Sequence, residues 1–390
     1  MNRRHFLSQT AGAAAAFSLF AATPARAFAE VQKADGMNYA PQGKPRPVVK
    51  AGEFPFAAAF LDHGHITGMV NGLTEAGATL QWIYEPNPEN FSRRDALQQR
   101  FPSAKIAKSF EEILDDPAVK MVAAAAVPNL RGPIGCRVMR AGKDYFTDKT
   151  PFTELAQLAE AKEIVEQTKR RYFVYFSERL HTESGMYATD LVQNGAIGKV
   201  IQVLGLGPHR LNKASRPAWF FERKKYGGIL CDIGSHQFEQ FLTYAGASDA
   251  TVAHAAVGNF ANPSTPELED FGEASLVGDN ATSNYIRVDW FTPDGLGTWG
   301  DGRIVILGTK GYIELRKYLD VAREKSGDHV YLVDEKSERH FNVTGQVGFR
   351  FFGEMILDCL NHTEKAMTQA HIFKAAELCL LAQEKAQRLT

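Results

Sequence analysis

The sequence predicts an α/β protein in which a doubly wound parallel sheet is followed by an α+β domain with an open, mainly antiparallel sheet. Short apolar runs alternate with amphipathic stretches over residues 54–177, as in strand–helix repeats. Residues 122–127 are small or branched apolar residues in succession, which is typical of strands buried on both faces of a parallel sheet. Beyond residue 198, strand-like segments follow one another across turns rather than helices.

The first 29 residues have the features of a twin-arginine export signal. Arg3 and Arg4 precede a mild apolar run that ends near two A-x-A cleavage options. This run is shorter than the ~20 residues needed to cross a bilayer, so no stable membrane anchor is expected. A signal of this kind exports folded proteins, commonly with a cofactor already inserted. We therefore expect a periplasmic or secreted protein, with residues 30–52, which are rich in Pro and Gly, as an extended arm.

Composition limits the class of partner. The net charge is -1, with 44 Lys and Arg against 45 Asp and Glu, so no basic field indicates nucleic acid. At 44% hydrophobic residues the chain can bury two cores, predicted over residues 53–178 and 179–390, with the option that the last helix packs back on the first domain. The cysteines have no C-x-x-C spacing and are expected to be buried free thiols; they are Cys136, Cys231, Cys359 and Cys379.

The elements follow from the local patterns. In the first domain we expect strands at 54–61, 79–85, 122–127, 144–147 and 172–177, and helices at 65–76, 90–101, 132–141 and 154–169. A further helix begins at Ser109, which has capping-box spacing to Glu112. In the second domain we expect strands at 199–205, 283–291, 302–308, 312–315 and 330–333, closed by helices at 354–361 and 370–388.

The turn after the first strand lies where a Rossmann fingerprint, G-x-G-x-x-G, is expected. Gly64 occupies the middle glycine position, but Asp62 stands at the first. A dinucleotide pyrophosphate would lie at the N-terminus of the next helix. The predicted cofactor contacts in this turn are His63, Gly64, His65 and Ile66. His63 and His65 have no local third ligand, so no metal site is predicted.

Glu85 ends the second strand, about 20 residues after the turn, where an acid commonly holds the ribose hydroxyls. A carboxylate repels a 2′-phosphate, so Glu85 slightly favours NAD over NADP. Arg93 and Arg94 weaken that preference because they follow closely in the sequence.

Asp232 and His236 follow the glycine pair Gly227 and Gly228. In a helix they would lie one turn apart on one face. A carboxylate that orients an imidazole gives a proton acceptor near neutral pH, although such pairs also occur as ordinary surface contacts. The two glycines would let a flat ligand approach the backbone.

Three segments resemble the Gfo/Idh/MocA family of nicotinamide-dependent sugar and polyol oxidoreductases, and the resemblance spans about residues 54–388. Residues 141–152, AGKDYFTDKTPF, resemble the family's A-G-K-x-V-x-x-E-K-P, with Asp148 in place of Glu and Thr150 inserted before the proline. Residues 227–236 resemble its G-G-x-x-x-D-x-G-x-H. Residues 127–129 are similar to its T-P-N, with Arg131 near the position where a His often follows.

The resemblance implies a site at which NAD or NADP meets a small carbohydrate or polyol. It places Lys149 between cofactor and substrate, hydrogen-bonded to the reacting oxygen, and makes Asp232 and His236 the proton-transfer pair. Pro128, Asn129 and Asp148 join Lys149 on the cofactor side. It also implies a homo-oligomer formed through the C-terminal sheet.

Between the predicted domains, residues 207–221 combine aromatic faces with fixed hydrogen-bond donors, which suits a carbohydrate. The substrate candidates are His209, Arg210, Arg216 and Trp219. A second cluster at residues 299–303 is interpreted either as a pocket wall or as a subunit interface.

We therefore expect an exported NAD(P)-dependent oxidoreductase that acts on a hydroxyl of a sugar, sugar derivative or polyol. Its nucleotide would be tightly bound, because no cellular pool exists outside the cytoplasm. One alternative is redox-neutral glycoside cleavage through transient oxidation, elimination, hydration and reduction. Another is a sugar- or nucleotide-binding protein without catalysis, which the departure at Asp62 favours.

Overall fold

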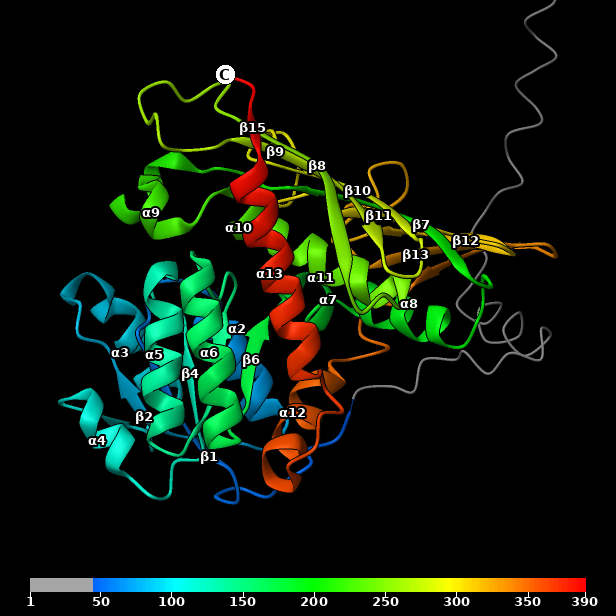
Figure 1. Cartoon of the computed structure of the whole chain (residues 1–390). Coiled ribbons are helices and arrows are strands. Elements are labelled where there is room, and N and C mark those ends of the chain that lie inside the picture. Colours follow the sequence, from blue (N-terminus) through cyan, green and yellow to red (C-terminus); the bar gives the residue numbers. More distant parts are fainter. Residues whose placement is uncertain (1–44) are drawn as a thin grey trace, which may run out of the picture. The chain divides into compact units, whose positions relative to one another are not determined.

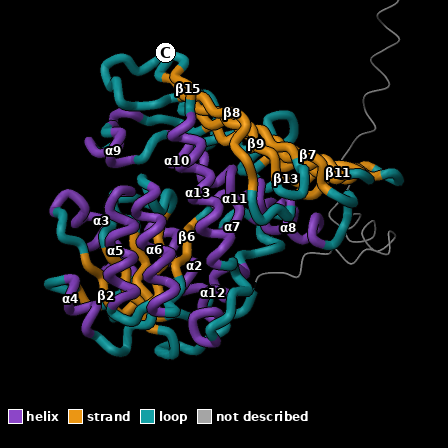
Figure 2. Tube along the Cα trace, viewed as in Figure 1, coloured by secondary structure: helices purple, strands orange, loops and turns teal. Residues whose placement is uncertain are grey.

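A computed structural model describes residues 45–390, and these belong to one compact unit that contains two β-sheets (Figures 1 and 2). The predicted export signal and the first part of the predicted arm lie outside the described residues. The end of that arm lies along the first domain, where the amide of Val48 donates to the carbonyl of Ala76 at 3.0 Å. Within residues 45–390, no helix combines the length and the apolar character that crossing a membrane requires.

The first sheet is parallel throughout, with strand order β3-β2-β1-β4-β5-β6. Its strands are β1 (Pro55–Ala59), β2 (Thr79–Tyr84), β3 (Lys105–Ile106), β4 (Met121–Ala124), β5 (Asp144–Asp148) and β6 (Tyr172–Tyr175). Every residue of β1, β4 and β5 is buried, which explains why these strands lack a polar alternation. The predicted doubly wound sheet is confirmed. The chain order reverses between β1 and β4, and in such sheets ligands bind at the carboxyl ends beside that point.

The helices of this domain are α2 (His65–Glu75), α3 (Phe91–Arg100), α4 (Phe110–Asp115), α5 (Pro128–Arg140) and α6 (Leu155–Thr168). Ser109 caps α4 as predicted, accepting a hydrogen bond from the amide of Glu112 at 3.3 Å. The predicted start of α5 at residue 132 is wrong by four residues. Pro128 opens the helix instead, because proline is favoured at a first helical position, where the amide would have no partner.

The second sheet has the order β14-β13-β12-β11-β7-β10-β9-β8-β15 and is mainly antiparallel, with parallel pairs only at β7–β10 and β8–β15 in the part of the chain described. Its strands are β7 (Val200–Pro208), β8 (Ala250–Gly258), β9 (Phe271–Gly278), β10 (Ser283–Asp289), β11 (Arg303–Gly308), β12 (Gly311–Arg316), β13 (His329–Asp334), β14 (Glu338–Asn342) and β15 (Gln387–Arg388). This confirms the predicted second domain, although β8, β9 and β14 were not predicted.

Helices cover one face of this sheet (Figure 2). The helices that contact its strands are α8 (Glu183–Gln193), α10 (Ile229–Asp232), α11 (Gly234–Ala245) and α13 (Gln369–Lys385). The other helices after β6 are α7 (Ser177–Leu180), α9 (Arg223–Tyr226) and α12 (Arg350–Asn361), of which α12 contacts α2 of the first domain. Residues on the other face are exposed, including Ile201, Val277, Leu307 and Tyr312 at 40–47%.

The last helix contacts both domains. α13 packs on β8 and α11 and also on α6 and β6 (Figure 1). At its start, the side chain of Gln369 accepts from the amide of Tyr172 at 2.8 Å and so binds the edge strand β6. The predicted extension of this helix to Arg388 is wrong, because Gln387 and Arg388 leave the helix and pair with β8. The four predicted free thiols are confirmed as buried.

Candidate active site

A cavity of about 280 Å³ lies where the carboxyl ends of the parallel strands face the second sheet. It joins most of the predicted site residues, which come from sequence positions far apart. The lining is His63, His65, Pro128, Arg131, Lys149, Ser177, His209, Arg210, Arg216, Trp219, Phe220, Asp232, His236, Trp290 and Trp299. The predicted contacts Gly64, Ile66, Glu85, Asn129 and Asp148 lie around the cavity rather than in its lining.

Lys149 and Asp232 form an ion pair between the two domains. Lys149 follows the last residue of β5, and Asp232 is the last residue of α10. The ammonium nitrogen lies 2.6 Å from Oδ1 of Asp232, and the two residues are only 5% and 7% exposed. Burial alone would raise the pKa of Asp232, but Lys149 beside it holds that pKa below its usual value. Asp232 is therefore an ionised acceptor at neutral pH.

His236 lies one helical turn beyond Asp232, as the spacing predicted. Burial lowers the pKa of its imidazole to about 3, so the ring is neutral and able to accept a proton at neutral pH. Its Nδ1 is buried and has no hydrogen-bond partner among the described residues. Oδ1 of Asp232 binds Lys149, and no hydrogen bond within residues 45–390 joins Asp232 to Nδ1 of this imidazole.

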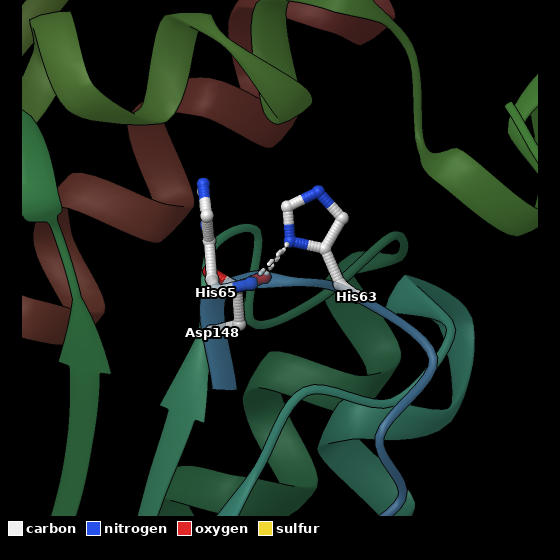
Figure 3. A group of neighbouring side chains, drawn as sticks. All are labelled: His63, His65 and Asp148. Carbon is white, nitrogen blue, oxygen red and sulfur yellow. Dashed lines mark hydrogen bonds and ion pairs between the residues drawn. The ribbon is translucent and has the colours of Figure 1, made fainter. Parts of the chain in front are cut away.

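His63, His65 and Asp148 form a second cluster, in which both imidazole rings stand over the Asp148 carboxylate (Figure 3). Nδ1 of His63 lies 2.9 Å from Oδ2 of Asp148, and Nδ1 of His65 lies 2.8 Å from Oδ1. Asp148 is fully buried. Although burial would raise its pKa, His65, Arg131 and His63 hold the pKa well below the usual range.

Asp148 is a possible third metal ligand beside His63 and His65, and it comes from a distant part of the sequence. However, the Asp148 carboxylate already faces four donors, since Arg131 lies 3.2 Å from Oδ2 and the amide of Lys149 donates to Oδ1 at 2.8 Å. Four donors fill the acceptor sites of a carboxylate, and the guanidinium repels a further cation. The arrangement therefore suits orientation of the two imidazoles through their Nδ1 atoms, which leaves each Nε2 for a ligand.

The nucleotide turn has room for a dinucleotide. Gly64 precedes α2, and a Cβ placed on it would meet no atom within 4 Å. Oδ1 of Asn129 is buried and has no hydrogen-bond partner in the described range, so it can accept from a bound group. Glu85 receives backbone amides from Leu61 and Asn87. These residues fit a cofactor whose phosphates face the helix start and whose ribose approaches Glu85.

The substrate candidates line the opposite wall. The guanidinium of Arg216 lies over the rings of Phe220 and Trp290, at 4.6 and 4.9 Å from their centroids. Trp299 packs edge-on against His209, with ring centroids 4.5 Å apart, and of the cluster at residues 299–303 it is the member that lines the cavity. Arg210 differs, because its guanidinium also donates to the carbonyls of Pro293 and Leu296 and holds that loop.

Five lining residues were not among the predicted site residues: Arg131, Ser177, Phe220, Trp290 and Trp299. Arg131 had been noted only as a departure from the T-P-N segment. It is 1% exposed and donates to the carbonyls of Ala126 and Lys149, which ties the segment after β4 to the backbone of Lys149. Trp290 directly follows β10, and no local motif indicated that it would reach the cavity.

Comparison with known proteins agrees with this architecture. The GFO/IDH/MocA C-terminal domain family matches residues 186–314. A crystal structure of a protein from Erwinia carotovora atroseptica SCRI1043, described as an oxidoreductase, is 46% identical, with a TM-score of 0.83, and covers 87% of this chain and 100% of that one. A levoglucosan dehydrogenase in complex with NADH shares the fold, with a TM-score of 0.69 at 16% identity over 85% of this chain and 96% of that one.

Among curated proteins, the scyllo-inositol 2-dehydrogenase (NADP(+)) IolW of Bacillus subtilis is 24% identical over 42% of this chain and 45% of its own length. The chain spans roughly half the length of the curated relatives it matches.

Proposed function

Because the chain belongs to the Gfo/Idh/MocA family of oxidoreductases, we propose that it oxidises or reduces a hydroxyl-bearing carbon of a sugar, sugar derivative or polyol, with NAD or NADP as hydride carrier. One observation carries the proposal: the Lys149–Asp232 ion pair and the neutral His236 imidazole line a single cavity. An alcohol oxidation needs a hydrogen-bond donor on the reacting oxygen and a base for its proton, and this cavity offers both.

The cofactor, when bound, accepts or returns hydride at its nicotinamide ring. In the oxidation direction, the Lys149 ammonium donates to the substrate oxygen and orients it. Asp232 holds that ammonium in place from the second domain. The proton of the hydroxyl passes to Nε2 of His236, whose burial keeps it unprotonated beforehand. Arg131 fixes the backbone at Lys149, so the ammonium position is set by buried contacts.

The cavity wall favours a polyhydroxylated substrate. Trp219, Trp290 and Trp299 offer aromatic faces to the C–H side of a sugar ring, and Arg216 and the His63–His65 pair offer fixed polar groups to its hydroxyls. His209 adds a further imidazole. At about 280 Å³ the described cavity suits one small ring better than a polymer.

NAD is proposed as the preferred nucleotide. Glu85 lies at the end of β2 with both carboxylate oxygens fixed by backbone amides, where it would repel a 2′-phosphate. Arg93 opposes this preference, because its guanidinium donates to the carbonyl of Leu61 in the same turn.

Export by the twin-arginine route and a homo-oligomer are also part of the proposal. The exposed apolar residues on the open face of the second sheet support an oligomer contact there. Fractionation of the native host, and light scattering of the purified chain, would test the two statements.

The test of function begins with the full chain purified from its own host and denatured for mass spectrometry of released nucleotide. Aldoses, polyols and their glycosides are then supplied with added NAD or NADP, and both NADH absorbance and products are followed. Formation of a keto product with stoichiometric reduced nucleotide supports the proposal. Release of an aglycone without net reduced nucleotide would instead support redox-neutral cleavage.

Lys149→Ala serves as the inactive reference and Lys162→Ala, at an exposed position of α6, as its matched control. We expect the first substitution to reduce turnover by about 10²-fold or more and the second to leave it unchanged. Nucleotide binding with no product from any substrate class, in the wild type as in Lys149→Ala, would contradict an enzymatic role and favour a binding protein.

A further inference from the structure

The proposed base, His236, lacks the carboxylate that a catalytic imidazole needs on its second nitrogen. Nδ1 of His236 is buried without a partner in the described part of the chain, and Oδ1 of Asp232 binds Lys149 instead. Glu178 on α7 is 2% exposed, and its Oε1 lies 3.7 Å from Nε2 of His209 in the cavity lining. Its Oε1 also has no hydrogen-bond partner in the described part of the chain. Two buried polar atoms of complementary chemistry are thus left unmatched in the same region.

We propose that Glu178 is the positioning residue of the active site, which binds the Nδ1–H of His236 directly or through one water and so makes Nε2 the catalytic base. This inference rests on the proposed function. Glu178 does not line the cavity and would act through His236 rather than on the substrate.

The surroundings of Glu178 hold it in place and ionised. Its other oxygen, Oε2, accepts from the side-chain amide of Gln237 at 2.9 Å and from the ammonium of the fully buried Lys317 at 3.3 Å. Burial alone would raise the pKa of Glu178, but Lys317 and the imidazoles of His236 and His209 lower it to about 2. Oε2 therefore accepts the hydrogen bonds that hold the side chain in place, and Oε1 remains able to accept another hydrogen bond.

The same contacts fix the helix that carries His236. Lys317 also donates to Oε1 of Gln240 at 2.6 Å, and Gln240 in turn donates to the carbonyl of His236 at 2.9 Å. Glu178, Lys317 and Gln240 thus form a buried chain of hydrogen bonds behind the imidazole. A group so placed can set the orientation of the ring without contacting the substrate.

The other nearby imidazole does not supply the missing donor. Nε2 of His209 is 3.7 Å from Oε1 of Glu178, beyond hydrogen-bond distance. Nδ1 of His209 lies 3.2 Å from the carbonyl of Gly207, so Nδ1 carries the proton of the neutral ring. Burial lowers the pKa of His209 to about 4, which leaves Nε2 as an acceptor at neutral pH. Of these two imidazoles, His236 is the one whose Nδ1 has no hydrogen-bond partner within residues 45–390.

The proton balance follows. The substrate O–H bond breaks as its proton forms a bond to Nε2 of His236, while the hydride leaves for the bound nicotinamide. The resulting imidazolium carries Nδ1–H toward the Glu178 carboxylate, which stabilises its charge and stays ionised. Nε2 then returns the proton to solvent.

The first test reads the tautomer of His236 without any turnover. Nitrogen NMR of ¹⁵N-histidine-labelled full-length protein at neutral pH separates protonated from unprotonated ring nitrogens, with His236→Gln to assign the signal. We expect Nδ1–H with an unprotonated Nε2 in the wild type, and a mixture of tautomers in Glu178→Gln. An identical tautomer in both proteins would overturn the proposal.

The second test is kinetic and includes a conservative variant. Glu178→Gln should lower kcat by about 10²-fold with a smaller change in KM, and Glu178→Asp should recover part of the loss. The charged and titratable groups facing His236 are Glu178, Lys149, His209 and His65, and only Glu178 raises its pKa. Removing that charge should therefore move the acid limb of the kcat profile to lower pH.

Glu239→Gln is the matched control. Like Glu178, Glu239 is a buried carboxylate, but it lies on α11 and is paired with Arg179, and neither of these two residues lines the cavity. It should change thermal stability without moving the pH profile. If Glu178→Gln behaves like Glu239→Gln in both readouts, Glu178 is only structural. The NMR result stands even if no substrate is found, so it separates failure of this proposal from failure of the proposed oxidoreductase function.

Discussion

The ammonium group of Lys149 binds Oδ1 of Asp232 at 2.6 Å, although the two residues lie 83 positions apart in the sequence. Lys149 belongs to the parallel-sheet domain and Asp232 to the domain of the second sheet. The pair therefore couples formation of the candidate site to the contact between the two domains.

Substitution of one residue of the Lys149–Asp232 pair should lower the stability of the protein. Asp232→Asn leaves the Lys149 ammonium buried without its counter-ion, and breaking such a pair costs about 3–5 kcal/mol in comparable cases. We expect the double variant Lys149→Met/Asp232→Asn to be more stable than Asp232→Asn alone, because no isolated charge remains. Thermal unfolding of the single and double variants measures this. If Asp232→Asn unfolds at the same temperature as the double variant and the wild type, the ion pair contributes nothing to stability.

Stability should fall in acid because several imidazoles are buried neutral. Burial lowers the pKa of His63 and His236 to about 3 and of His209 and His181 to about 4, from an ordinary 6.5. Between those values the unfolded chain binds protons that the folded chain does not. The free energy of unfolding should therefore decrease as pH falls below about 6.5, by up to ~1.4 kcal/mol per pH unit for each group.

Denaturant unfolding at pH 7.5, 6.0 and 5.0 measures how the free energy of unfolding depends on pH. His181→Gln, outside the cavity lining, should weaken this pH dependence, while His254→Gln at an exposed position should leave it unchanged. A stability that is flat over this range would contradict the burial of neutral imidazoles.

Nucleotide preference should depend on Glu85. Glu85→Gln removes the charge that repels a 2′-phosphate and keeps an acceptor for one of the two backbone amides that the carboxylate binds. We expect the ratio of NADP to NAD affinity to rise about tenfold, which corresponds to ~1.4 kcal/mol. Titration of the apo-protein with NADH and NADPH measures the ratio, with Glu89→Gln on the nearby surface as the control. An unchanged ratio would place the 2′-hydroxyl elsewhere.

Arg216 should act on substrate affinity. Its guanidinium lies over the rings of Phe220 and Trp290 in the cavity wall, and burial lowers its pKa. Arg216→Met keeps the length of the side chain but removes the hydrogen-bond donors, so KM should rise about tenfold with a smaller change in kcat. Arg137→Met, an exposed arginine on α5, is the control. A fall in kcat with constant KM would instead place Arg216 at the reacting atoms.

The sequence predicted correctly those helices and strands whose residue pattern is contained within the element itself. The cap at Ser109, the buried strand β4 and the strand–helix alternation of the first domain all follow from nearest neighbours in the chain. β9 was missed because its inward positions include Gly272, where a Cβ would lie 2.6 Å from Ile229. Close packing of α10 selects a small residue there, and the apolar alternation of a strand is weakened.

The site divides in the same way. Lys149, Asp232 and His236 are residue types that indicate proton transfer. Asp232 ends α10 and His236 lies in the first turn of α11, four residues later. The fold decides that Lys149 is the residue that binds Asp232. Likewise, the turn that contains His63 and His65 gave no hint of Asp148, which reaches it from β5.

The sequence by itself determined the two sheet types, the nucleotide turn at Gly64 and the chemical groups available to the site, because these depend on periodicity and residue type. The tertiary structure decided which carboxylate serves which base: Asp232 for Lys149, Asp148 for His63 and His65, and the unmatched Glu178 beside His236. A hydrogen bond forms over about 3 Å, and only the packing of the two domains brings residues so far apart in the chain within that distance.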